Sequence, residues 1–414
     1  MFFLDTEDRS CSSLMEILHQ YKTSSNQLIN TSKSSISFSP KILQVIRERV
    51  KSHLGIAQEG GVSKYLGLPE HFGRRKKDLF TSIVDQIKLK AAGWASSQLS
   101  SAGKLAMLKA VLTAKPSFAM SCFQLPVSLC SRIQSALTRF WWDASPDKKK
   151  MCWVAWDKIT APKALGDLGV RDIQAFNTTL LAKQVWRIVS KPECLLSRVL
   201  RGKYCSKKPF LQVDAPKAAS HGWRSILVGR YLLITNLSKA IGDGEITRVW
   251  KDPWLSMELP SRPVGPMQEI HQDLFVADLL CRGTREWNIP MIQSILPQHV
   301  PEILRIKPSI TGAEDSYVWL TSSSGVYSAK SGYYVATAME IIDSTANQNY
   351  YKATWRCKTS PKLHLFLWKI AQGALALGEN LAKRGLVSNV TCRHCGELET
   401  AEHIFLHCHF TRQI

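Results

Sequence analysis

The sequence lacks any long apolar run. Although 45% of its 414 residues are hydrophobic, no stretch approaches the roughly 20 consecutive apolar residues that cross a bilayer. The apolar start Met1–Leu4 meets its first acidic residue at Asp5, which is too early for a signal peptide. We therefore expect a protein that is nuclear or cytoplasmic, is not secreted and has no membrane partner.

Several motifs that carry common chemistry are also missing. The sequence has no Gly-x4-Gly-Lys-Ser/Thr loop, no Gly-x-Gly-x-x-Gly after a strand and no Gly-x-Ser-x-Gly elbow. Pairs of aspartates such as Asp167 and Asp172 lack the apolar strand and turn that would hold two carboxylates on one metal ion. We read them as solvated loop residues, and we predict no catalytic residue.

Cysteine usage argues against a disulfide framework. The chain has 11 cysteines, an odd number, and eight of them stand singly among apolar or mixed neighbours. Isolated cysteines of this kind are typical of reduced thiols in an intracellular protein. The remaining three lie close together near the C-terminus and form part of a different pattern.

Acidic residues are scarce, and the excess of positive charge is uneven. The formal net charge is +21. Residues 1–250 hold 38 lysines and arginines against 18 acidic residues, a net of +20, whereas residues 251–414 hold 16 against 15, a net of +1. A basic surface concentrates polyanions around itself, which favours nucleic acid as the partner. The alternative is a surface that lysines merely keep soluble.

Apolar periodicity predicts a mainly α fold. We expect a helical thumb-like bundle, short β-hairpins in the middle of the chain and a small helical zinc-binding domain at the C-terminus. Ser360-Pro361 has the form of a helix N-cap followed by proline at the first helical position. The predicted boundaries divide the chain into residues 1–60, 61–240, 241–350 and 351–414.

Two hairpins are predicted in the third of these regions. The turn Gly242–Gly244 precedes the alternating segment Glu245–Trp250, and the turn Ser322–Gly325 joins Tyr317–Leu320 to Val326–Ser328. Residues 257–312 are rich in proline and read as an extended linker with short helices.

A metal-binding pattern lies near the C-terminus. Cys392, Cys395, His403 and Cys408 follow the spacing Cys-x2-Cys-x7-His-x4-Cys. Two cysteines two residues apart reach one ion from a tight turn, and a His and a Cys on a following helix can complete a tetrahedron. Three thiolates and one imidazole leave no position for water, so the pattern predicts a structural Zn²⁺, one per chain. Three other side chains are open alternatives as ligands: His394, His407 and Cys357. The net negative charge of the zinc site could be offset by nearby basic residues, which are Arg393, Lys383 and Arg384.

Many short motifs follow one another in the order seen in one family. They are Lys64–Pro69, Gly93–Trp94, Leu99–Lys104, Phe118–Ser121, Phe140–Trp142, Gly169–Asp172, Ala175–Asn177, Leu181–Gln184, Ile241–Gly244, Trp250–Leu255, Trp319, Gly325, Tyr327, Trp355, Pro361–Lys362, Phe366 and Trp368. In this order the chain resembles plant LINE-type non-LTR retrotransposon reverse transcriptases, from the region after the polymerase palm to the reverse transcriptase zinc-binding domain. Two positions depart from the pattern of the family. They are Gly166-Asp167, where Gly-Gly is usual, and Gly378, where a polar residue is usual, and both leave the local turn geometry open.

The resemblance implies what this chain lacks. In the family, two adjacent catalytic aspartates lie shortly before the segment that Phe2–Leu4 matches, so we expect the polymerase active site to be absent. The upstream endonuclease and any ribonuclease H domain are expected to be absent as well. It follows that the chain should have no polymerase activity of its own, and that an intact reverse transcriptase is a conceivable partner besides RNA or DNA.

Two basic clusters are the candidate nucleic-acid contacts. Arg74, Arg75, Lys76 and Lys77 form one, and Lys148, Lys149 and Lys150, with Trp153 and Trp156 nearby, form the other. Polymerase thumbs hold a template–primer duplex by its phosphates, which calls for such residues. The competing interpretations are solvated charge runs and tryptophans that pack in the core. For the whole chain, the alternatives to nucleic-acid binding are a protein–protein interaction module and a degenerate fragment without a selected function.

Overall fold

The computed structural model describes most of the chain, in two compact units formed by residues 1–80 and 81–414. The described residues are 2–60, 64–65, 68–69, 80–93, 98–145, 148–161, 163, 166–281, 283–338 and 348–413.

The first unit is a small helical pair. Helices α1 (Asp8–Ser25) and α2 (Gln44–Leu54) pack against each other, and the 3-10 helix η1 (Thr31–Lys33) lies between them in sequence. Fully buried Cys11 contacts Val50 and Leu54 in their shared core, which fits its interpretation as a reduced core thiol. Strands β1 (Lys64–Tyr65) and β2 (Leu68–Pro69) form an antiparallel pair.

The second unit is built mainly from helices. In chain order its elements are α4 (Thr81–Gly93), α5 (Ser101–Met107), η2 (Leu108–Leu112), α6 (Ser117–Cys122), α7 (Val127–Trp142), α8 (Trp156–Thr160), α9 (Ile173–Ser190), α10 (Leu195–Tyr204), α11 (His221–Ile234), β3 (Leu237–Ala240), η4 (Glu269–His271), η5 (Val276–Leu279), α12 (Ile289–Ile295), η6 (Pro297–His299), α13 (Val300–Arg305), β4 (Ser316–Trp319), α14 (Ala329–Ala338), α15 (Gln348–Arg356), α16 (Pro361–Ala371), α17 (Gly378–Ala382), η7 (His403–His407) and η8 (Thr411–Gln413).

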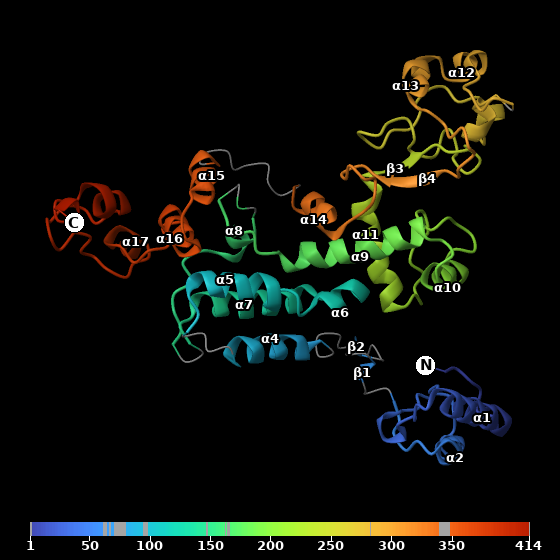
Figure 1. The fold of residues 1–414 in the computed structure, drawn as a ribbon, viewed down its shortest axis with the longest axis horizontal. Coiled ribbons are helices and arrows are strands. Elements are labelled where there is room, and N and C mark those ends of the chain that lie inside the picture. The colour runs from blue at the N-terminus through green and yellow to red at the C-terminus, as the bar shows by residue number, and fades with distance from the viewer. Residues whose placement is uncertain are drawn as a thin grey trace. The chain divides into compact units, whose positions relative to one another are not determined.

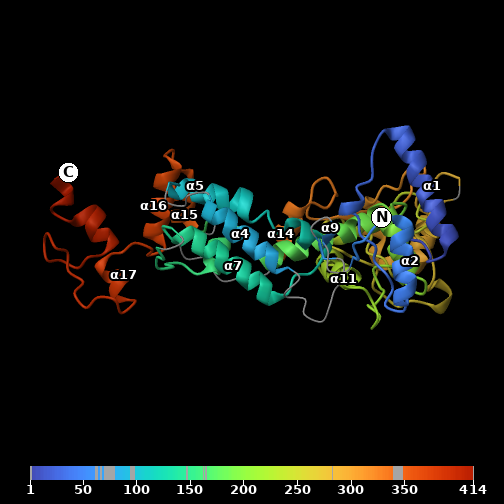
Figure 2. The same cartoon turned by 90° about the horizontal axis from the view of Figure 1, so that it is seen from below.

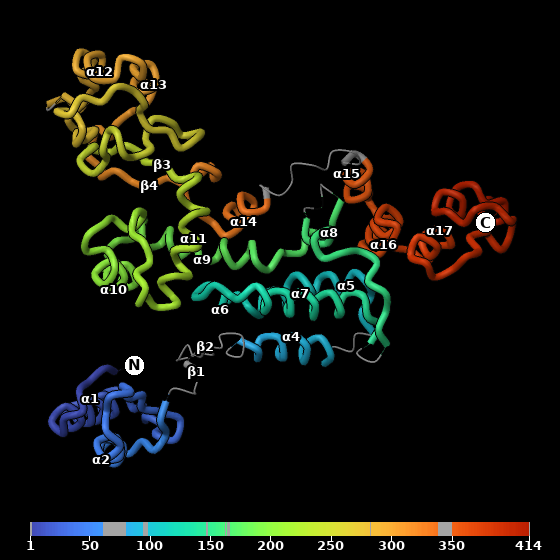
Figure 3. The backbone as a smooth tube through the Cα atoms, turned by 180° about the vertical axis from the view of Figure 1, so that it is seen from behind, coloured from blue at the N-terminus to red at the C-terminus, as the bar shows by residue number. Residues whose placement is uncertain are grey.

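Helix α9 is the centre of this unit. It packs against α6, α7, α11 and α14, and α4 lies on the far side of α7 (Figures 1 and 3). Its N-terminus is capped by Asp172, whose Oδ1 accepts from the Ala175 N–H at 2.8 Å. Buried Asn177 donates to the carbonyls of Met120 and Phe123 and accepts from Leu125 N–H. One side chain thus fixes the end of α6 against α9.

The crossing of α9 and α11 depends on a glycine. A Cβ at Gly229 would lie 2.3 Å from the Ala182 backbone nitrogen, so any larger residue would force the helices apart. Around this contact, Val185, Ile188 and Trp223 are buried in one hydrophobic cluster that also includes Trp319 and Tyr327. The cluster therefore joins residues that are more than 140 positions apart.

The strands pair differently from the two hairpins that the sequence predicts. Strand β3 ends before the Gly242–Gly244 turn and pairs antiparallel with β4, Leu237 lying opposite Trp319. Glu245–Trp250 is turn and loop apart from Arg248, which forms an isolated antiparallel bridge with Phe275. The turn after β4 is closed by the Trp319 N–H, which donates to the Gly325 carbonyl. Tertiary packing of Leu237 and Trp319 in the cluster on α9 outweighs the local alternation.

The segment that reads as a proline-rich linker shares a hydrophobic core with the residues just before it. Val249, Trp254, Val276 and Ile292 are fully buried together with five further apolar residues. The Trp254 indole donates to the Val249 carbonyl at 2.9 Å. Short helices η5, α12 and α13 supply several of the apolar side chains, so the prolines begin short helices around a packed centre.

Helix α16 begins where the sequence predicts. Ser360 Oγ accepts from the Leu363 N–H, and Pro361 occupies the first turn. Figure 2 shows α16 beside α5, a contact that brings the C-terminal part of the chain to the helical region. The fully buried Trp368 indole donates to the Gly166 carbonyl at 2.9 Å, and so connects the two parts through a hydrogen bond as well.

The predicted fold class, mainly α with short strands in the middle and a small C-terminal cysteine–histidine unit, is confirmed. Within the described part of the chain, none of the helices combines the length and the apolar character that crossing a membrane requires.

Candidate metal centre and nucleic-acid interface

The first two candidate zinc ligands sit on a short hairpin. Thr391 and Leu398 form an isolated antiparallel bridge. Inside it the Cys392 N–H donates to the Glu397 carbonyl and the Gly396 N–H donates to the Cys392 carbonyl. Gly396 has φ +80°, a left-handed conformation that glycine adopts without strain. This tight turn is what lets two cysteines, two residues apart, face one point.

The other two candidate ligands flank a single π-helical turn, η7: His403 is its first residue and Cys408 follows its last residue. The Cys408 N–H donates to the His403 carbonyl at 2.6 Å, an i→i+5 bond. In an α-helix, positions five apart point about 140° away from each other, whereas an i→i+5 turn brings them closer to one side. Thr400 Oγ1 accepts from the His403 N–H and fixes the start of the turn. The π-helical turn therefore explains why four residues separate His403 from Cys408: this spacing lets both side chains face the same side.

The four ligand atoms converge. All lie within 4.8 Å of one another, and Cys408 Sγ is 4.0 Å from both Cys392 Sγ and Cys395 Sγ. Sulfurs bound to one tetrahedral zinc at about 2.3 Å lie roughly 3.8 Å apart, so these separations fit. Cys395 Sγ and His403 Nε2 are closer, at 3.0 Å. Cys392 and Cys408 are buried, and the donor set of three sulfurs and one imidazole is the kind that zinc prefers.

The alternative ligands lie elsewhere. The His394 ring stacks on Phe410 with centroids 4.3 Å apart, and His407 is within hydrogen-bond reach of Glu402 and Arg412. Cys357 is exposed and outside the group.

Two of the basic residues that the sequence suggests as charge partners of the zinc shell have other contacts. Lys383 pairs with Glu379, and Arg384 donates to the Trp153 carbonyl at 2.5 Å. The Glu399 side chain accepts from the Gly378 N–H at 3.0 Å. It thereby holds the start of α17 against the metal unit.

Of the two predicted basic clusters, only the second lies among the residues that the structure describes. Arg74, Arg75, Lys76 and Lys77 lie outside the described residues. Lys148, Lys149 and Lys150 are exposed on the segment that follows α7. Asp143 Oδ1 accepts from the Lys150 N–H at 2.9 Å and so fixes the backbone of this segment, while the ammonium groups remain on the surface.

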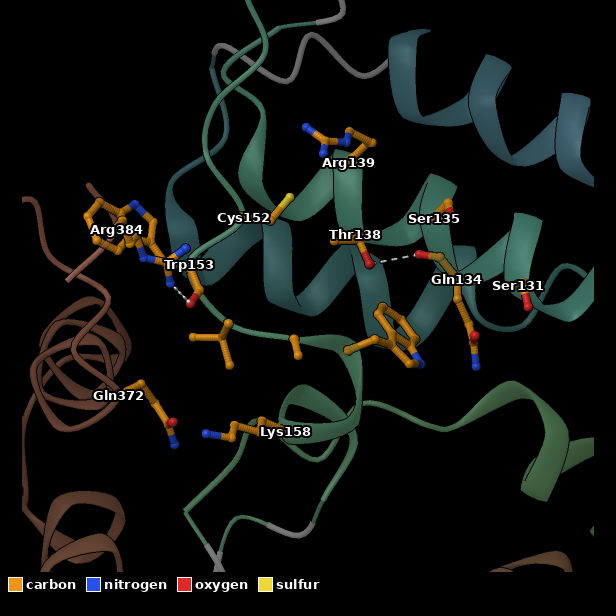
Figure 4. A pocket seen from close by; sticks show the side chains of 13 residues that line it. Ser131, Gln134, Ser135, Thr138, Arg139, Cys152, Trp153, Lys158, Gln372 and Arg384 are labelled. Atoms are coloured by element: carbon orange, nitrogen blue, oxygen red, sulfur yellow. Dashed lines mark hydrogen bonds between the residues drawn. The ribbon is translucent and has the colours of Figure 1, made fainter. Parts of the chain in front are cut away.

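A cavity of about 720 Å³ lies beside this segment (Figure 4). Its rim carries the exposed side chains of Arg139, Lys158 and Arg384. The Arg384 guanidinium lies 4.9 Å from the centre of the Trp153 ring and comes from the C-terminal part of the chain, whereas Arg139 comes from α7. Basic residues from distant parts of the sequence therefore lie together at this cavity. No local sequence pattern predicts that they do.

The tryptophans divide into two groups. Trp141 and Trp142 are buried, at 6% and 8% exposed, and pack edge to face on each other, as the core interpretation predicts. Trp153, Trp156 and Trp186 are half-buried. Because Arg384 covers the Trp153 ring, that ring is not a free platform for stacking a base.

The aspartates considered as a metal pair have separate structural roles. Asp172 caps α9 and also accepts from Gln134. Asp167 is 7% exposed and its Oδ1 is 3.4 Å from Gln372 Nε2. Burial raises the pKa of Asp167 to about 7, against a smaller opposing effect of Lys158. Neither belongs to the group that could hold a metal among the described residues.

Comparison with known protein families identifies the C-terminal part. Residues 327–414 match the family described as zinc-binding in reverse transcriptase. The match contains the four converging ligand candidates and begins at Tyr327, upstream of the boundary predicted at residue 351.

Two proteins of Arabidopsis thaliana are similar to longer parts of the chain. One, named for ribonuclease H, is 29% identical over 347 residues, which are 81% of this chain and 55% of that protein. The other, an uncharacterized mitochondrial protein, is 45% identical over 153 residues, which are 37% of this chain and 99% of that protein. The chain thus spans about half the length of the first relative and nearly all of the second.

Proposed function

The chain belongs to the family of plant retroelement reverse transcriptases, and from this premise we propose that it binds nucleic acid by the phosphates and holds one structural zinc ion, without polymerase activity of its own. The observation that carries the proposal is the exposed run Lys148–Lys150 beside a cavity rimmed by Arg139, Lys158 and Arg384. Phosphate contacts supply most of the affinity of proteins that bind nucleic acid without reading its sequence.

In this proposal Cys392, Cys395, His403 and Cys408 hold the zinc. When bound, the ion cross-links the hairpin to the π-helical turn, and four protein ligands leave no position for water or substrate. The metal unit then supports α17 through Glu399, and Arg384 follows α17. Zinc would therefore help to place a basic side chain of the cavity rim.

The proposed partner is RNA or DNA, either the RNA of a retroelement or a template–primer duplex. An intact reverse transcriptase is proposed as a second partner, because this chain would supply a basic, zinc-stabilised surface to an enzyme that supplies the chemistry. Phosphoryl transfer needs carboxylates that hold metal ions, and we propose no such pair for this chain.

Replacing Lys148, Lys149 and Lys150 together by alanine tests the nucleic-acid interface. We expect weaker duplex binding and a slope of log K against log salt that flattens by up to about 0.9 for each phosphate that is no longer neutralised. Binding is measured by fluorescence anisotropy at several salt concentrations. A control with Lys191, Lys207 and Lys217 replaced by alanine has the same change in net charge at three other exposed lysines and should keep the wild-type slope. Equal losses of affinity in both variants would mean that only total charge matters.

Primer extension tests the absence of polymerase activity. With Mg²⁺ or Mn²⁺ and an RNA or DNA template, we expect no template-directed incorporation above that of a mock preparation. A reverse transcriptase on the same template serves as the positive control. Incorporation that depends on the template would contradict this part of the proposal.

A further inference from the structure

A second cavity, of about 600 Å³, lies where the helical region meets the C-terminal part. Its wall includes Lys104 from α5, Lys150 and Trp153 from the segment after α7, and Lys369 from α16. These lysines are separated by up to 265 residues in sequence, and they come together because α16 packs beside α5 (Figures 1 and 2).

The ammonium groups of this cavity are poorly neutralised by the described residues. Lys104 is 8% exposed and its three-donor ammonium group has one acceptor, the Asp143 carbonyl at 2.5 Å. It also lies 5.8 Å from the centre of the Phe140 ring. For Lys150 and Lys369, no ion pair or hydrogen bond of the ammonium group is found with the described part of the chain.

The remaining polar groups of the wall do not supply the missing acceptors. Asp143 is the acidic side chain of the described wall, and its Oδ1 already accepts from the Lys150 N–H and lies 3.5 Å from an Arg139 guanidinium nitrogen. Trp141 and Trp142 also belong to the wall, and the buried N–H of each indole has no acceptor among the residues that the structure describes. Several N–H donors without an acceptor among the described residues therefore gather around this cavity.

Like charges are also close enough to interact. Burial lowers the pKa of Lys104, and the nearby Lys150 and Lys369 lower it further, against the opposite effect of Asp143. Burial likewise lowers the pKa of Lys369, and Lys150 adds to the effect. An anion in the cavity would favour the charged forms of Lys104 and Lys369.

We infer that this cavity binds phosphates of a nucleic-acid backbone, with Lys104 and Lys150 contributed by the helical region and Lys369 by α16. This inference rests on the proposed nucleic-acid binding and names its site. The inference also places a phosphate contact outside residues 1–250, the region that the charge count favours. Lys369 lies in residues 251–414, whose net charge is only +1. The contact is to phosphates and not to bases, since Arg384 covers the Trp153 ring and lysine is a point charge.

The test uses the zinc-loaded full chain and a fluorescent duplex. Lys369→Ala is compared with Lys362→Ala, which removes an exposed lysine of the same helix that does not line the cavity. We expect Lys369→Ala to reduce the salt slope by about 0.9, and Lys362→Ala to leave it unchanged. Lys369→Arg keeps the charge and should keep the slope, which separates the effect of the missing charge from misfolding.

The outcomes distinguish this inference from the proposed function. If wild-type protein binds the duplex and Lys369→Ala has the same slope, the cavity is not the phosphate site although nucleic-acid binding stands. If wild-type protein does not bind, the proposed function itself fails. Inorganic phosphate at constant ionic strength should not displace the duplex, and displacement would assign the cavity to a free phosphate instead.

Discussion

Removal of zinc is expected to unfold the segment from the Cys392 hairpin to Cys408 while the helices around α9 remain folded. The segment has few buried apolar residues, with Phe405, Leu406 and Phe410 all substantially exposed. A structural zinc contributes about 10 kcal/mol or more to such units. The cluster on α9 contains its own buried core and does not depend on the metal ligands.

The measurement combines elemental analysis with hydrogen exchange. We expect one zinc per chain, and a Cys395→Ser variant with little or none. Two amides report local folding, those of Cys392 and Cys408, because each donates within the unit. Both should lose protection in the variant or with a strong chelator. Cys357→Ser is the matched control, since Cys357 is exposed and outside the ligand group. Full metal content in Cys395→Ser would contradict the ligand assignment.

Asp315→Ala is expected to destabilise the second unit by about 3–5 kcal/mol. The Asp315 carboxylate is 7% exposed and accepts three hydrogen bonds, from the Gly242 and Gly244 N–H groups and from the Thr247 hydroxyl, at 2.6–2.9 Å. Its removal leaves three buried donors without a partner. Each unpaired donor lowers the unfolding free energy by about 1–3 kcal/mol, and relaxation of the surrounding structure offsets part of this loss.

Chemical denaturation measures this effect. The control is Glu314→Ala, which removes the exposed neighbouring carboxylate and should change the unfolding free energy by less than about 0.5 kcal/mol. Asp315→Asn keeps the size of the side chain but replaces one acceptor by a donor, so we expect it to be destabilised as well. A denaturation midpoint for Asp315→Ala equal to that of Glu314→Ala would show that the Gly-Asp-Gly turn does not depend on this carboxylate.

The sequence predicts those features that depend on local chemistry. The Ser360-Pro361 helix start and the grouping of Cys392, Cys395, His403 and Cys408 follow from short-range spacing, and both are found in the structure. The strand pairing does not follow, because β3 and β4 are joined by packing against α9 and not by a turn between them. For the same reason no local pattern indicates that Asp315 is the partner of a turn about 70 residues earlier.

The grouping of basic residues on the surface is likewise only partly predictable from the sequence. The run Lys148–Lys150 is visible in sequence, whereas Lys104, Lys369 and the pair Lys383-Arg384 lie in segments far from it. Lys104 approaches that run because α5 packs on α7, and its ammonium group donates to the Asp143 carbonyl. Lys369 approaches it because α16 packs beside α5, and Arg384 because it donates to the Trp153 carbonyl. Charge counting over long windows therefore predicts an interface in residues 1–250, while the interface that we propose also includes basic residues from beyond residue 360.

The most direct test of the account is the affinity of the zinc-loaded full chain for a duplex as a function of salt. Contacts from Lys104, Lys148, Lys149, Lys150 and Lys369 to five phosphates predict a slope of roughly −4.5, and hence a decrease in affinity of about 500-fold between about 50 and 200 mM salt. Duplexes of different sequence should give similar values. An affinity that stays constant over this range, as expected of an apolar protein–protein interface, or no binding at low salt, would contradict the account.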